Sequence, residues 1–117
     1  MRIEEFIDKY DLHDSLVEQV ENINEQLIFN IELCNWRQKD YSPKDDEMKS
    51  LKLVFNNVKD YTLDATTSEF DSDTILEFTC LHEGGSFEMH NIKFVIEGEG
   101  DIKIIEFKSD TVDVDII

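Results

Sequence analysis

His13 and Asp14 stand side by side just before the first strongly alternating part of the chain. An adjacent His-Asp pair is typical of metal-dependent phosphohydrolases, which need further histidine and aspartate ligands to complete the coordination shell. The other histidines, His82 and His90, both fall in the second half of the chain. We therefore interpret His13, Asp14 and Ser15 as a structural turn, in which Asp14 and Ser15 bond backbone amides and His13 packs beside them.

A second set of oxygen-bearing side chains, Asp71-Ser72-Asp73, has the spacing that opens a calcium loop. An EF-hand loop then requires a glycine at its sixth position and a glutamate at its twelfth. This chain has Leu76 and His82 there, so the pattern fails. The sequence predicts no metal, no cofactor and no catalytic residue, and we expect the protein not to be an enzyme.

The two cysteines, Cys34 and Cys80, each lie inside an apolar run. Cys80 and His82 would share one side of a strand, but no orienting residue or oxyanion-hole turn accompanies them. We expect both thiols to be free and buried. The N-terminus carries acids where a signal peptide is basic and apolar, and no stretch reaches the roughly 20 apolar residues of a membrane span. Together these features predict a cytoplasmic protein.

The elements that must position these residues begin with a short amphipathic helix over residues 2–10, followed by residues 26–35, where apolar and polar side chains alternate as in a strand. Residues 15–23 fit either a helix or a strand with a bulge, and we favour a hairpin from 15–23 into 26–35. Residues 37–50 and 62–74 read as polar connections. Further alternating segments follow up to Ile116.

The resulting prediction is a single domain over residues 1–117, of the mainly β (α+β) class. We expect an antiparallel sheet of six to seven strands, curled or sandwich-like, with one short N-terminal helix. Its core is predicted to contain the following apolar side chains: Phe29, Ile31, Leu33, Phe55, Phe78, Phe94 and Ile104.

The net charge of -17, from 28 acidic and 11 basic residues, is the most unusual global property of the chain. It disfavours nucleic acid and anionic membranes as partners, and it favours a basic protein. Long connections are where binding residues tend to lie. We therefore predict partner binding by the acids of the two polar connections: Asp40, Asp45, Asp46, Glu47, Glu69, Asp71 and Asp73.

The stretch Leu12-His13-Asp14-Ser15, followed by a hydrophobic hairpin, resembles a group of small bacterial proteins that begin with a short helix and an "(F/L)HD(S/A)" turn. The segment LKLVFNNVKDY, residues 51–61, extends the resemblance. Some members of this group are immunity proteins of polymorphic toxin systems, and others have unknown functions. The resemblance implies a β-rich, non-enzymatic domain that neutralises a toxin, and the acidic charge of the chain implies that this toxin would be basic. The alternative is a small structural or accessory domain that self-associates; the residues do not determine the oligomeric state.

Overall fold

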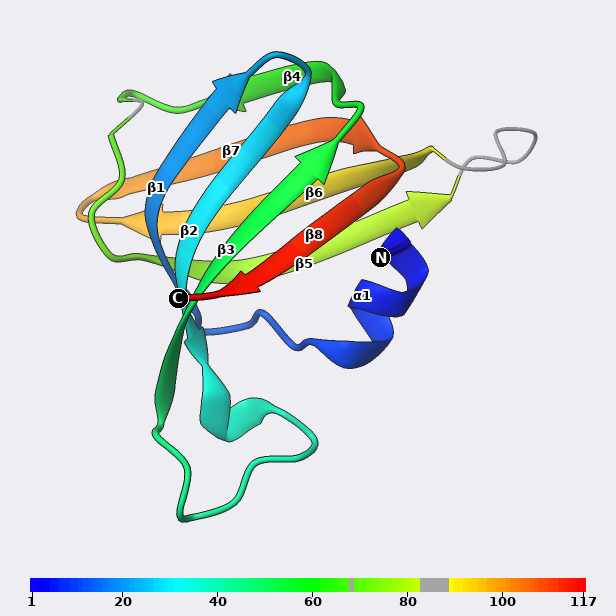
Figure 1. Cartoon of the computed structure of the whole chain (residues 1–117). Coiled ribbons are helices and arrows are strands. Elements are labelled where there is room, and N and C mark those ends of the chain that lie inside the picture. The colour runs from blue at the N-terminus through cyan, green and yellow to red at the C-terminus, as the bar shows by residue number, and fades with distance from the viewer. Residues whose placement is uncertain (68, 83–88) are drawn as a thin grey trace.

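Alternating apolar side chains dominate this chain, and the structure assembles them into one antiparallel sheet of eight strands. The structure is a computed structural model that describes residues 1–67, 69–82 and 89–117. Figure 1 shows its elements, which are α1 (Ile3–Lys9), β1 (Leu16–Ile23), β2 (Gln26–Cys34), the 3-10 turn η1 (Asn35–Arg37), β3 (Met48–Asn56), β4 (Lys59–Asp64), β5 (Asp73–His82), β6 (His90–Gly98), β7 (Asp101–Ser109) and β8 (Thr111–Ile116). The predicted mainly β class with one N-terminal helix is confirmed.

The order of the strands is β4-β7-β6-β5-β1-β2-β3-β8, so β4 and β8 are the two edges. β1, β2, β3 and β8 form one half of the sheet, which crosses over the half formed by β4, β7, β6 and β5 (Figure 1). The apolar faces of the two halves pack against each other, with α1 beside β8 and β5 at the open side.

At one corner the chain passes twice from one half of the sheet to the other, and side chains bond these two crossings to each other. β3 leads into β4 through Asn57, whose φ is 52°, and β7 leads into β8 through Asp110. The buried hydroxyl of Ser109 donates to the carbonyl of Asn56 at 2.7 Å, and the amide of Asn57 donates to the carboxylate of Asp110 at 2.7 Å. Because asparagine tolerates positive φ, Asn57 suits this sharp crossing.

Phenylalanine rings fill the space between the halves. Phe29 on β2 and Phe94 on β6 stack at 4.6 Å between ring centroids, and Phe55 meets Phe29 edge-on at 5.7 Å. Aromatic pairs of this kind contribute about 0.5–1.5 kcal/mol each beyond the area they bury. Five of the predicted core side chains are buried as expected: Phe29, Ile31, Leu33, Phe55 and Phe94. Phe78 is half-buried and packs on the edge of this core.

The predicted burial of Ile104 is wrong. Ile105 and Phe107 point into the core instead, together with Lys103, while Ile104 is only half-buried. The phase of β7 is reversed because Lys103 forms a buried ion pair with Asp73 and lies over the ring of Phe70, 4.7 Å from its centroid. A buried lysine is tolerated when it is paired in this way.

The hairpin of β1 and β2 is confirmed, and residues 16–23 are a strand. The register shifts between Val17 and Gln19, as expected for a strand with a bulge. The predicted helix is confirmed over Ile3–Lys9, with Ile3 and Phe6 buried.

The eighth strand, β4, lies partly within residues that we predicted to be a connection. Its sequence KDYTLD has little apolar alternation, and its exposed residues explain why no strand was predicted there. The two polar connections are correspondingly shorter than predicted, at residues 38–47 and 65–72. Among the described residues, no helix has both the length and the apolar character needed to cross a bilayer.

Candidate functional site

The turn at His13, Asp14 and Ser15 joins three strands. Asp14, with a φ of 68°, donates its amide to the carbonyl of Ile75 at 2.9 Å, and the amide of Ile75 donates to the carbonyl of Ser15 at 2.8 Å. The hydroxyl of Ser15, which is fully buried, accepts the amide of Cys34 at 2.8 Å. The start of β1, the end of β2 and the start of β5 therefore meet at this turn.

The carboxylates of Asp11 and Asp14 at this turn both pair with Arg37, Asp11 at 3.4 Å. Asp14 contacts Arg37 at 3.3 Å and the Nδ1 of His13 at 3.2 Å. Asp11, and not Asp14, accepts a backbone amide in this turn, that of His13, at 3.0 Å. The described residues contain no group of three or more His, Cys, Asp or Glu side chains placed to hold a metal.

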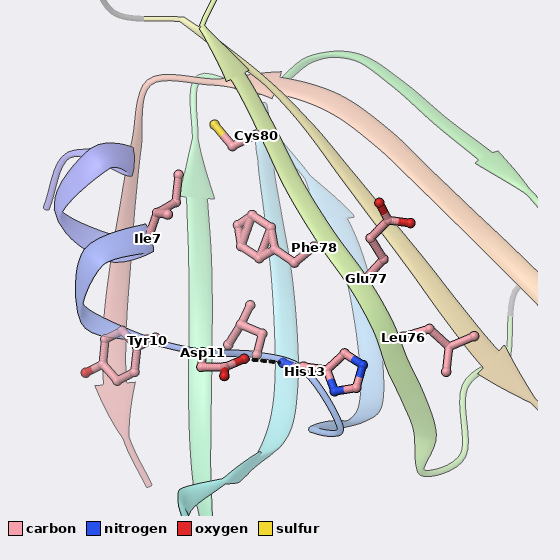
Figure 2. A pocket seen from close by; sticks show the side chains of 9 residues that line it. Ile7, Tyr10, Asp11, His13, Leu76, Glu77, Phe78 and Cys80 are labelled. Carbon is pink, nitrogen blue, oxygen red and sulfur yellow. Dashed lines mark hydrogen bonds between the residues drawn. The ribbon is translucent and has the colours of Figure 1, made fainter. Parts of the chain in front are cut away.

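A groove of about 320 Å³ opens beside this turn, between α1 and β5 (Figure 2). Phe78 and Cys80 point from β5 toward Ile7 on α1, whereas Leu76 and Glu77 lie on the other side of the strand. The segment of Tyr10, Asp11, Leu12 and His13 closes the lower end of the groove. The groove thus has an apolar inner wall, and Glu77 lies on its outer side.

Cys80 is a poor nucleophile in this position. Burial, and to a lesser extent the nearby charge of Glu4, raise the pKa of its thiol to about 11. Burial likewise raises the pKa of Cys34, which is 2% exposed. Thiolates, and not thiols, attack electrophiles, so both cysteines are largely unreactive at neutral pH.

The predicted acids of the first connection lie on the surface but are matched by bases. Asp40, Asp45, Asp46 and Glu47 are exposed. Residues 37–49 also contain four basic side chains, those of Arg37, Lys39, Lys44 and Lys49. Three of the acids and three of the lysines line the same depression of about 790 Å³, between this connection and the end of α1. This segment carries no net charge and is a weak attractant for a basic partner.

Asp73 is not a surface residue, so its assignment to partner binding is corrected. Its side chain is 6% exposed and pairs with Lys103. A Cβ atom added at Gly98 would lie only 2.7 Å from a carboxylate oxygen of Asp73, so the buried carboxylate packs directly against this glycine. Glu69 and Asp71 are exposed as predicted, but their connection lies at a different side of the molecule from residues 38–47 (Figure 1).

A concentration of acids lies around the connection of β4 to β5 and the turn of β6 to β7, and it includes residues that we did not predict. The two segments touch, because Thr66 donates its hydroxyl to Asp101 at 2.9 Å. Lys103 is the basic residue of this region, and it is buried. We call this surface the acidic end; its members are Asp64, Glu69, Asp71, Glu97, Glu99 and Asp101. A signal was present in the sequence, since no lysine or arginine occurs between residues 60 and 92.

In comparisons with known proteins, no family model, no curated protein and no solved structure matches the chain.

Proposed function

We propose that this chain is a non-enzymatic binding protein whose acidic end attracts a basic protein. The observation that carries the proposal is the acidic end itself, where six acids gather and where Lys103, the one lysine among the described residues of its two segments, is buried against Asp73. Uncompensated charge of one sign focuses the electric field and speeds the encounter with a partner of opposite charge. The resemblance of Leu12-His13-Asp14-Ser15 to immunity proteins supports a finer form of the proposal, in which the partner is a basic bacterial toxin.

The test is to capture partners from the native cell and to measure the association of the purified best candidate by surface plasmon resonance. A variant with the six acids of the acidic end changed to Asn or Gln should associate on the order of tenfold more slowly, with a weaker dependence on salt. The matched control changes Asp40, Asp45, Asp46 and Glu47 in the same way, and it should affect association less because nearby lysines already balance these acids. Equal rates for all three proteins, or no basic partner, would refute the proposal.

A second candidate function, self-association, has one observation in its favour. Ile116 and Ile117 are 65% and 74% exposed at the end of the edge strand β8. Against it, Asp113 and Asp115 on the same strand would meet like charges in an edge-to-edge pair. Sedimentation at increasing protein concentration distinguishes the two functions: a monomer at the highest concentration removes the second.

A further inference from the structure

The strand β5 has an open edge along most of its length. β1 pairs with it only through Leu16–Thr74 and Val17–Asp73 among the described residues, and then the two strands diverge. On its other side β5 pairs with β6 from Thr74 to His82. From Leu76 onward, therefore, one edge of β5 has no neighbouring strand in the part of the chain that the structure describes. An open edge of this kind is a template for an added strand.

The register identifies the backbone groups on this edge. Ile75 bonds Asp14 and Ser15 through its backbone and therefore faces away from β6. A shift of register between Ile75 and Glu77 moves the alternation by one residue. Because hydrogen-bonded and non-hydrogen-bonded pairs alternate in an antiparallel ladder, the N–H and C=O groups of Phe78 and Cys80 face the open edge.

The groove between α1 and β5 runs along this same edge, and its two sides differ chemically. The inner side presents Ile7, which is 43% exposed, with Phe78 and Cys80. The outer side presents Glu77, and Asp11 lies at the lower end. None of the described residues that line the groove is a lysine or an arginine. Asp11 is paired with Arg37 at 3.4 Å from outside the groove, so Glu77 is the acid that a basic side chain of a partner would meet.

We propose that this groove binds an extended segment of a basic partner protein, which adds to the open edge of β5 as a further strand. Successive side chains of a strand point to opposite faces. A segment that alternates apolar and basic residues would therefore place its apolar side chains against Ile7 and Phe78, and its basic side chains beside Glu77. Main-chain hydrogen bonds to Phe78 and Cys80 would supply affinity, as in other cases of strand addition. The inference rests on the proposed function, because it takes the partner to be a basic protein.

The experiment uses three capped heptapeptides as probes. The first alternates lysine and valine, the second replaces each lysine with glutamate, and the third is the lysine peptide with its central valine changed to proline. Binding is followed by amide NMR spectra and hydrogen exchange on the full chain at low salt. The lysine peptide should slow the exchange of the Phe78 and Cys80 amides. The other two should bind roughly tenfold or more weakly, because one is repelled and the other lacks a backbone donor and cannot pair as a strand.

Two variants and a control test the groove itself. Ile7→Lys places a charge on the inner wall at an exposed helix position, so the fold should survive and binding of the lysine peptide should be lost. Glu77→Gln should weaken that binding about threefold. Glu106→Gln, the same change on the exposed face of β7, should leave it unaltered. Circular dichroism confirms that each variant is folded.

The possible results separate this inference from the proposed function. Protection at Phe78 and Cys80 that Ile7→Lys abolishes supports strand addition. Protection at the acidic end alone overturns strand addition but leaves a basic partner in place. Failure of the lysine peptide to bind also overturns strand addition, while the association rates of a captured partner decide the proposed function separately.

Discussion

At the residue scale, Ser15 links the two halves of the sheet through its backbone and anchors the end of β2 through its hydroxyl. The hydroxyl accepts the buried amide of Cys34 at the end of β2, while the carbonyl of the same residue accepts the amide of Ile75 on β5. Since β1 and β5 share only two residue pairs, the bond from Ile75 to the carbonyl of Ser15 is one of the few backbone links between these two strands.

Ser15→Ala should therefore lower the free energy of unfolding by about 1–3 kcal/mol, the cost of leaving a buried amide without an acceptor. Urea denaturation followed by tryptophan fluorescence measures the change. His13→Ala, at the exposed neighbouring position, is the control and should change stability by about 0.5 kcal/mol or less. Equal effects of the two changes would contradict a structural role for the Ser15 hydroxyl.

The raised pKa of Cys80 has a measurable consequence. Because the pKa lies at about 11 in the folded protein instead of the ordinary 9.0, the folded state retains the thiol proton over this interval. Its contribution to stability is present below pH 9.0 and is lost as the pH rises toward 11. The rate of alkylation by iodoacetamide, followed by mass spectrometry, should reach half its maximum near pH 11. In urea the midpoint should return to about 9, and a folded-state midpoint near 9 would contradict the effect of burial.

At the scale of the element, β7 shows that the alternation of side chains alone does not decide which face of a strand is buried. Ile102, Ile104 and Ile105 are all apolar, so both phases of the strand bury isoleucine. The structure selects the phase that buries Lys103, because Asp73 on β5 neutralises it. The pairing of two residues so far apart in the chain leaves no local pattern in the sequence.

Ile105→Ala should destabilise the protein by about 2–5 kcal/mol, as for other large-to-small changes in a core. Ile104→Ala, on the opposite face of the same strand, should cost about 1 kcal/mol or less. Thermal unfolding of the two variants provides the comparison. A larger loss of stability from the change at residue 104 would show that Ile104, and not Ile105, faces the core.

The local elements were predictable because each leaves a signal over a few residues. The helix, the β1–β2 hairpin and its bulge follow from periodicity within residues 3–34. The open edge of β5 was not predictable, because it depends on which distant strands become neighbours. For the acidic end the sequence shows the lack of lysine and arginine between residues 60 and 92, but not that this segment meets the turn of β6 to β7. Asp73 illustrates the limit: its sequence context is that of a surface acid, and only the position of Lys103 explains its burial.

At the scale of the whole molecule, the charge of -17 acts on stability as well as on binding. Self-repulsion opposes the compact state, and salt screens it. The melting temperature should therefore rise by several degrees between roughly 20 and 500 mM sodium chloride. Scanning calorimetry measures the shift, with sodium sulfate at matched ionic strength to separate screening from general salting-out. A melting temperature that falls with added chloride would show that attractive ion pairs dominate.

The corner where β3 crosses to β4 and β7 crosses to β8 also constrains the folding pathway. Asn56 and Thr111, which share a hydrogen bond at this corner, are 55 positions apart in the chain. Joining such distant residues costs chain entropy before any contact compensates for it. The β1–β2 hairpin has only a short turn to close and can form early, whereas the edge strand β8 must wait for the corner. Refolding in a stopped-flow instrument should accordingly take milliseconds to seconds, in the range of β proteins with non-local pairing. Asn56→Ala should slow it if the corner forms in the transition state, so that the rate of folding depends on the meeting of a turn in the middle of the chain with a turn near its C-terminus.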